Sequence, residues 1–324
     1  LVRQFGELSS RVEGAGVHWH CTVARDEREC RIHCFALRDE AEYLTKYRQA
    51  DETIAHSRSP SVLGTLSAVA DWLNGAELTE MYECYPFIDE QKRILERISG
   101  DVFGGEPGLA QSSETELRHH ADDLYTLFIR GSGRSCKMSY SGKIDSVGAT
   151  FSWDDSVLFQ FSPADNAQLA LVLKSWLCDT LQPSEMRLKF PWLTIGELAD
   201  YYEAGNPVEG EFIVSWAAAE EFYLNLQWSF SDAALRFMQE LRAKGYDKTL
   251  RAGQSMSSLV LSRMRRSGVR GDRPSIQFWF HKDGMKVVNY IDNHRNGVES
   301  HHPRIELTSE IDALLRQLES KPVD

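Results

Sequence analysis

The stretch SVLFQFSPADNAQLALVLKSW, residues 156–176, decides the fold class. Its first six residues alternate between apolar and other side chains, as in a half-buried β-strand. The dipeptide Ser162-Pro163 then supplies a helix cap and a first helical residue, and apolar residues from Leu169 to Trp176 recur at helical spacing. The stretch therefore predicts a strand followed directly by an amphipathic helix.

The same order of strand, capping residue and helix occurs four times, at 31–47, 156–176, 223–243 and 304–319. Another strand candidate precedes each copy, so the unit is strand–strand–helix. Predicted strands include 124–129, 211–216 and 221–228, and a helix is expected to end around His119-His120. Asp283-Gly284 predicts a two-residue hairpin, and Thr308 or Ser309 is expected to cap the last helix. Strands that alternate are typical of antiparallel sheets with one solvated face. We therefore expect an α+β fold of antiparallel sheets with helices packed on one face, built from repeated strand–strand–helix units. Two or more units are expected to share one sheet.

The stretch from Ser99 to Glu114 is the best linker candidate. It is rich in glycine and serine, contains Pro107, and holds little that could pack. We therefore predict an acidic N-terminal α+β domain over residues 1–110, with a hairpin and helices, one of them from Asp39 to Tyr47. A C-terminal α+β domain with three strand–helix units is predicted over 115–324.

Composition and charge disfavour several classes of function. The 324 residues include 36 Lys and Arg against 48 Asp and Glu, for a net charge of −12. This balance disfavours bulk nucleic-acid binding, which needs a basic face. The sequence has no apolar run long enough to span a membrane. The six cysteines show no spacing typical of a secreted disulfide framework, so reduced thiols and a cytoplasmic location are expected.

The N-terminal hairpin, residues 17–35, is the densest cluster of metal-ligand residue types. Pairing its apolar positions gives one register, with these pairs: Val23 with Cys30, Cys21 with Ile32, and Trp19 with Cys34. The cysteines then face the core, while His20 lies opposite His33 with His18 diagonal to it. A metal site of these three histidines fits the register, but solvated or partner-facing imidazoles explain them without a metal. No cofactor is expected.

An arginine run is the second candidate site. It crowds into eleven residues with two glycines among them: Arg263, Arg265, Arg266, Arg270 and Arg273. Arginine is the preferred side chain for bidentate recognition of phosphate or carboxylate. Three interpretations stay open: an intramolecular partner for the acidic N-terminal block, contact with phosphate, nucleotide or nucleic acid, and binding of an acidic protein.

The sequence carries no motif of a hydrolase nucleophile, zinc protease, phosphate loop or dinucleotide site, so catalysis stays undecided. The first hypothesis is a cytosolic protein-interaction module, such as an inhibitor, an immunity-type protein or a subunit of a larger assembly, whose partner is another protein. Exposed Trp on an antiparallel sheet would mark the binding face. The alternatives are a phosphate-, nucleotide- or nucleic-acid-binding protein or enzyme that uses Arg263–Arg273, and a metal-binding protein that uses the hairpin histidines. No membrane partner is expected.

Overall fold

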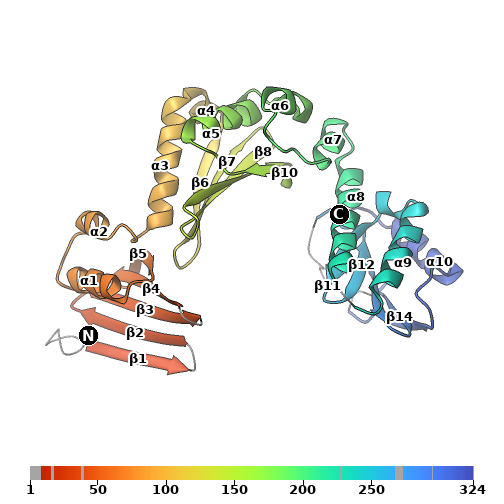
Figure 1. Ribbon diagram of the computed structural model, residues 1–324, viewed down its shortest axis with the longest axis horizontal. Coiled ribbons are helices and arrows are strands. Elements are labelled where there is room, and N and C mark those ends of the chain that lie inside the picture. The colour runs from red at the N-terminus through yellow and green to blue at the C-terminus, as the bar shows by residue number, and fades with distance from the viewer. Residues whose placement is uncertain are drawn as a thin grey trace. The chain divides into compact units, whose positions relative to one another are not determined.

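The computed structural model of the protein describes residues 9–15, 18–37, 40–226, 228–266, 273–293 and 295–323. The chain divides after Ile195 into two compact units, Leu1–Ile195 (unit 1) and Gly196–Asp324 (unit 2). The strands of the described residues form three five-stranded antiparallel sheets, with helices beside them (Figure 1). The α+β class with antiparallel sheets is therefore confirmed. Each sheet is made of five consecutive strands, so the expected sharing of one sheet by several units is wrong.

Sheet A and its helices form module A, residues 9–88 of unit 1. The elements are β1 (Ser9–Ala15), β2 (His18–Arg25), β3 (Arg28–Leu37), β4 (Glu40–Gln49), β5 (Glu52–Ser59), α1 (Val62–Leu73) and α2 (Leu78–Cys84). The Ser61 hydroxyl caps α1 by accepting a hydrogen bond from the Gly64 amide. The core between sheet and helix includes Cys30, Tyr47 and Trp72, each at most 1% exposed.

Sheet B and its helices form module B, residues 114–195. Two helices lead into it, α3 (Glu90–Gly105) and α4 (Pro107–Ser112). Its own elements are β6 (Glu114–Ala121), β7 (Leu124–Gly131), β8 (Arg134–Ser141), β9 (Ser146–Trp153), β10 (Ser156–Phe161), α5 (Asn166–Leu173), a π-helical turn (Lys174–Cys178) and α6 (Pro183–Lys189). Figure 1 shows α3, α4 and α5 over one face of this sheet.

Unit 2 contains module C, in which sheet C is followed by one helix. Its elements are α7 (Leu198–Glu203), α8 (Pro207–Asn225), α9 (Ser231–Ala243), a 3₁₀ turn (Tyr246–Lys248), β11 (Arg251–Ser255), β12 (Ser258–Ser262), β13 (Ser275–His281), β14 (Gly284–Asn289), β15 (Val298–His302) and α10 (Ser309–Glu319). A hairpin joins β13 to β14 where one was expected, but its two turn residues are Lys282 and Asp283, and Gly284 is the first residue of β14. The Thr308 hydroxyl caps α10 as expected, but the segment 304–307 before it is not a strand.

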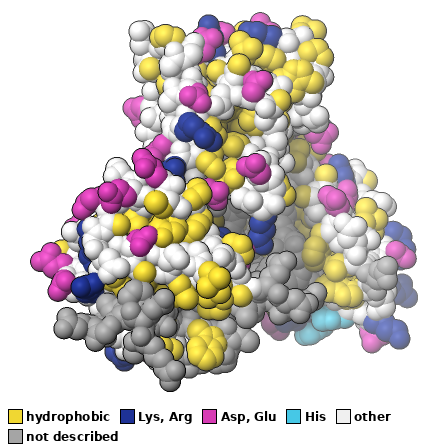
Figure 2. All heavy atoms as spheres, turned by 60° about the vertical axis from the view of Figure 1, so that its left-hand side comes forward, with side chains coloured by type: hydrophobic (Ala, Val, Ile, Leu, Met, Phe, Trp, Pro, Cys, Tyr) yellow, Lys and Arg dark blue, Asp and Glu magenta, His cyan; other side chains and the backbone are white. Residues whose placement is uncertain are grey.

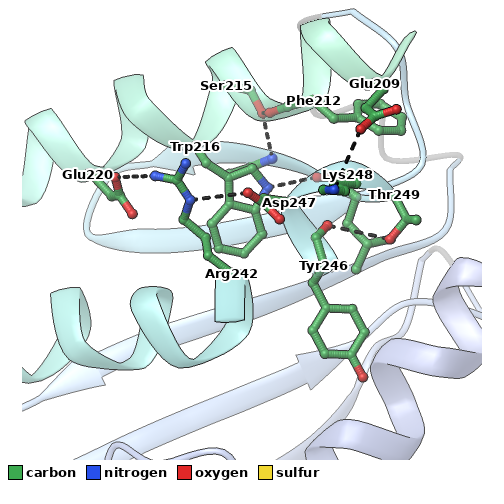
Figure 3. A network of polar contacts seen from close by, with 12 residues as sticks. Glu209, Phe212, Ser215, Trp216, Glu220, Arg242, Tyr246, Asp247, Lys248 and Thr249 are labelled. Atoms are coloured by element: carbon green, nitrogen blue, oxygen red, sulfur yellow. Dashed lines mark hydrogen bonds and ion pairs between the residues drawn. The ribbon is translucent and has the colours of Figure 1, made fainter. Parts of the chain in front are cut away.

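A polar network in unit 2 ties α8 to α9 and to the edge of sheet C (Figure 3). Arg242 of α9 donates hydrogen bonds to Glu220 of α8 at 2.8 Å and to Asp247 at 3.2 Å. The Ser215 hydroxyl of α8 accepts a hydrogen bond from the Ala252 amide of β11 at 2.9 Å. Helix α8 therefore satisfies part of an edge strand that would otherwise be open to pairing.

The register predicted for the β2–β3 hairpin is confirmed at all three apolar pairs: Val23 with Cys30, Cys21 with Ile32, and Trp19 with Cys34. His20 lies opposite His33, also as expected. Trp19 lies on the core side of sheet A but is 57% exposed, so the buried core does not cover this part of the sheet.

The helix predicted from Asp39 to Tyr47 is wrong, because β4 occupies this segment. Tyr43, Thr45 and Tyr47 alternate onto the core side and lie opposite β3. Thr45 and Tyr47 are 1% exposed in β4. This burial outweighs the helix propensity of the Glu, Ala, Leu and Lys residues in the same segment.

The strands predicted over 211–216 and 221–228 are wrong for the opposite reason, because α8 runs through the first segment and through 221–225 of the second. Four buried residues recur there at helical spacing: Phe212, Trp216, Ala219 and Tyr223. Of the four predicted copies, 156–176 shows a strand, β10, followed by a helix, α5. The repeated unit is not seen as it was expected.

The predicted linker from Ser99 to Glu114 is helical over most of its length. It holds the second half of α3 and all of α4, and it buries Val102 and Leu109 completely. The boundary expected between 110 and 115 lies inside unit 1, at the junction of α4 and β6.

A longer repeat relates modules A and B. In both modules a bulge interrupts the pairing of the last two strands of the sheet. The bulge lies next to a residue pair that includes a buried aromatic side chain: Tyr47 with Ala55 in module A, and Phe151 with Phe159 in module B. A buried tryptophan then follows the helix N-cap at the same spacing, Trp72 within α1 and Trp176 in the π-helical turn that continues α5. A short helix with a capping box follows in each module, α2 in one and α6 in the other. Modules A and B therefore share these irregularities at corresponding places.

An arginine next to the turn between the second and third strands meets the end of the following helix in all three modules. It is the first residue of the third strand in modules A and B, and it follows the second strand in module C. Its guanidinium donates to carbonyls at or just beyond the helix C-terminus, which have no partner within the helix. The contacts are Arg28 with Trp72 and Ala76, Arg134 with Trp176 and Leu181, and Arg263 with Lys321. The arginine joins each helix to its own sheet.

None of the helices in the described parts of the chain is both long and apolar enough to cross a membrane. Figure 2 shows acidic and basic side chains interspersed on the face it presents, with hydrophobic side chains exposed between them.

Candidate functional site

The arginine run lies between β12 and β13, and its first members contact the protein itself. Arg263 donates hydrogen bonds to the carbonyls of Thr249 at 2.6 Å and Lys321 at 2.9 Å. Arg265 Nε donates to Glu211 at 2.8 Å, and its Nη2 donates to the hydroxyl of Tyr202 at 3.1 Å.

Glu211 is the centre of this arrangement. Its side chain is 4% exposed, and it accepts hydrogen bonds from Arg265 and from the Tyr202 hydroxyl, with Arg266 4.0 Å away. Burial opposes the charge of Arg265, but the Glu211 carboxylate more than compensates and raises the pKa of Arg265. The first arginines of the run therefore pair within the protein with Glu211 of α8, whereas the expected intramolecular partner was the acidic N-terminal block. Arg270 lies outside the described residues, and Arg273 lies just before β13. Phosphate binding by this segment stays a prediction.

The hairpin histidines form a pair on the side of sheet A opposite α1. The rings of His20 and His33 have centroids 4.8 Å apart. Burial, followed by the charges of His20 and Lys46, lowers the pKa of His33. His18 belongs to β2, but its side chain lies outside the described part of the structure. Within that part, no group of three or more His, Cys, Asp or Glu residues is arranged to hold a metal ion.

One face of sheet B forms a different candidate site, which the sequence did not predict. One side of the sheet carries the buried residues Leu127, Ile129, Cys136 and Met138. Phe128 and Lys137 alternate with these residues and pair with each other, so they point to the opposite side. We call this opposite side of sheet B the open face. Its central row consists of Glu116, Phe128, Lys137, Thr150 and Gln160.

Phe128 lies between two guanidinium groups on the open face. The guanidinium carbons of Arg118 and Arg130 are 4.7 and 4.8 Å from its ring centroid. Glu116 holds both arginines, since it accepts hydrogen bonds from Arg118 at 3.0 Å and from Arg130 at 2.8 Å. The hydrogen bonds from Arg130 and Arg118 lower the pKa of Glu116. The three charged side chains remain 41–46% exposed. Their mutual contacts hold them in place, and solvent or a partner can still reach them.

A signal for this cluster exists in the sequence. Glu116 and Arg118 are two residues apart, as are Phe128 and Arg130, which is the spacing of one strand face. The sequence predicts the strand of Phe128 but takes the residues before it, around His119-His120, as the end of a helix. Without β6 the two pairs cannot be brought together.

Comparison with models of protein families, with curated proteins and with solved structures found no match to this chain. A function must therefore be inferred from the chemistry of its own surfaces.

Proposed function

We propose that this protein acts by binding another protein through the open face of sheet B. The observation that supports this most is Phe128 held between Arg118 and Arg130 on an exposed sheet face. Arginine and aromatic residues are enriched among the side chains that dominate protein interfaces. An inhibitor, an immunity-type protein and an assembly subunit would all use such a face.

The preorganisation of the cluster favours binding further. Long arginine side chains normally lose conformational freedom when an interface forms. Here Glu116 and the Phe128 ring already fix both guanidinium groups. Much of the ordering cost is therefore met in the free protein.

Charge indicates the kind of partner. The open face carries three basic side chains, Arg118, Arg130 and Lys137, against Glu114 and Glu116. It is thus slightly basic on a chain whose net charge is −12. We infer a partner whose contact surface is acidic around an apolar group that meets Phe128. The six cysteines are free in the structure, which supports the proposed cytoplasmic setting.

The test compares three immobilised forms of the full chain: wild type, Phe128→Ala and Leu188→Ala. Leu188 is a matched control, because it is an apolar residue of unit 1 on α6 that is 83% exposed. Proteins retained from a lysate of the source cells are identified by mass spectrometry. A retained protein is then purified and titrated against each form by calorimetry.

We expect one acidic partner that wild type and Leu188→Ala bind equally. Phe128→Ala should weaken this binding by about tenfold or more, as for a central interface aromatic. Thermal unfolding of each form verifies that it is folded. Equal binding of the same protein by wild type and by folded Phe128→Ala would rule out the open face as the binding site.

A further inference from the structure

A pocket of about 430 Å³ lies within unit 1, where the end of sheet A approaches α3 and sheet B. Its size is within the range of small-molecule sites. Charged and apolar side chains line it, and those that carry the argument are Arg58, Phe87, Glu90, Asp123, Leu124 and Lys143.

The charge of Arg58 is already committed to protein carboxylates. Its Nε donates to both oxygens of Asp123 at 3.1 Å, and its Nη1 donates to Glu42 at 3.2 Å. Asp123 is 7% exposed, so this contact is well shielded from solvent. Arg58 therefore lines the pocket with its charge already paired to Asp123 and Glu42.

Glu90 stands apart from this arrangement. It belongs to the first turn of α3 and lines the same pocket. Its carboxylate makes no hydrogen bond or ion pair with any residue in the described part of the chain. Burial, then the charges of Asp145 and Asp123, raise its pKa. A cation placed beside Glu90 would offset that repulsion.

The remaining wall is apolar. Phe87 and Leu124 line the pocket beside Glu90, and Leu124 is 45% exposed although it is a large apolar residue. A ligand body that covered Leu124 would remove apolar surface from water. A pocket that combines one uncommitted carboxylate with an apolar wall suits a molecule with both features.

We propose that this pocket binds a small organic cation with an apolar body, of the class of primary arylalkylamines. The ammonium group pairs with Glu90, and the body packs against Phe87 and Leu124. Lys143 at the rim is exposed and opposes a cation there. The site is independent of the open face, because it shares no residue with the Phe128 cluster.

The test titrates the full chain with 2-phenylethylamine and, as a neutral isostere, 2-phenylethanol, with calorimetry or ligand-observed NMR as the readout. Wild type should bind the amine at least about tenfold more tightly than the alcohol. Glu90→Gln should remove that preference. The control Glu96→Gln changes an exposed glutamate of the same helix outside the pocket lining and should retain it. Lys143→Met should strengthen amine binding, and Phe128→Ala should leave it unchanged.

Glu90→Gln is expected to fold, because its raised pKa means that the charge is held at a cost in the folded state. Its thermal midpoint should equal or exceed that of wild type. The proposal is overturned if the amine and the alcohol bind alike, if neither binds at about 10 mM, or if folded Glu90→Gln keeps the preference for the amine.

Discussion

The guanidinium of Arg134 lies 4.1 Å from the ring centroid of Trp176 and donates a hydrogen bond to the carbonyl of the same residue at 3.2 Å. The ring centroid of Trp153 is 4.2 Å from the same guanidinium, and the two indole rings meet edge to face with their centroids 6.2 Å apart. Arg134 is 4% exposed, and burial lowers its pKa to about 10. It is thus a buried cation held by two indole rings and by main-chain carbonyls.

Replacement of Arg134 by alanine should destabilise unit 1. The change removes a guanidinium that packs against two indole rings and leaves the carbonyls of Trp176 and Leu181 without this donor. We expect a loss of roughly 2–4 kcal/mol in the free energy of unfolding. Urea unfolding followed by tryptophan fluorescence measures it. Arg97→Ala, an exposed change on α3, should cost less than about 0.5 kcal/mol; a similar cost for both variants would contradict the role given to Arg134.

His56 should make unit 1 sensitive to mild acid. It is 8% exposed and its ring centroid is 4.6 Å from that of His119. Burial, then the charge of His119, lower its pKa from 6.5 to about 4. The unfolded chain therefore takes up a proton at a higher pH than the folded chain, and stability falls as the pH decreases from 6.5 towards 4.

The effect of His56 is separable from that of other groups by comparing variants. The loss of stability between neutral pH and pH 4 should be smaller in His56→Asn than in wild type by roughly 1–2 kcal/mol. Thermal or urea unfolding at several pH values measures the difference. His301→Asn, an exposed change in unit 2, should follow wild type. Parallel curves for wild type and His56→Asn would show that His56 does not titrate in this way.

Glu211 should be essential to unit 2 because it faces Arg265 and Arg266 in a nearly buried setting. Glu211→Gln removes the negative charge but keeps the size of the side chain. We expect a loss of roughly 3 kcal/mol, as when one partner of a buried pair is removed. Glu209→Gln, a change of an exposed partner 4.0 Å from Lys248, should have little effect on chemical unfolding. If the two variants were equally stable, the arginines would be held by other groups.

Glu116→Gln should change the behaviour of the open face rather than its stability. Exposed ion pairs contribute little, so unfolding should shift by less than about 1 kcal/mol. The face becomes more basic, and the proposed acidic partner should associate faster and with a steeper dependence on salt. Stopped-flow binding at two ionic strengths measures both effects. Slower association with the variant would contradict the proposed charge of the partner.

The sequence was sufficient where local pattern and burial agree. The register of β2 and β3 follows from pairing Cys21 and Cys30 with apolar neighbours, and the structure has that register. It was insufficient where tertiary contacts decide the element. Tyr47 lies in a segment of good helix formers but is buried as part of β4, whereas Trp216 lies in a segment rich in strand-forming residues but belongs to α8.

The relation between modules A and B was also present in the sequence, but at long range. The dipeptide Trp72-Leu73 is followed by Glu80-Met81 and Pro86, and Trp176-Leu177 by Glu185-Met186 and Pro191. A search for local strand–helix junctions does not find this relation, because the matching residues lie in or just after the helices and not at those junctions. The candidate site was hidden for a similar reason, since Glu116 and Phe128 meet only when β6 pairs with β7.

The arginines beside the turns between the second and third strands make each module self-contained in one respect. Arg28, Arg134 and Arg263 each bind the helix end of their own module. The contact that closes a module is therefore supplied from within it, and adding or losing a neighbour leaves that contact intact. Each module thus carries its own contact between sheet and helix, while its exposed surface differs from those of the other modules.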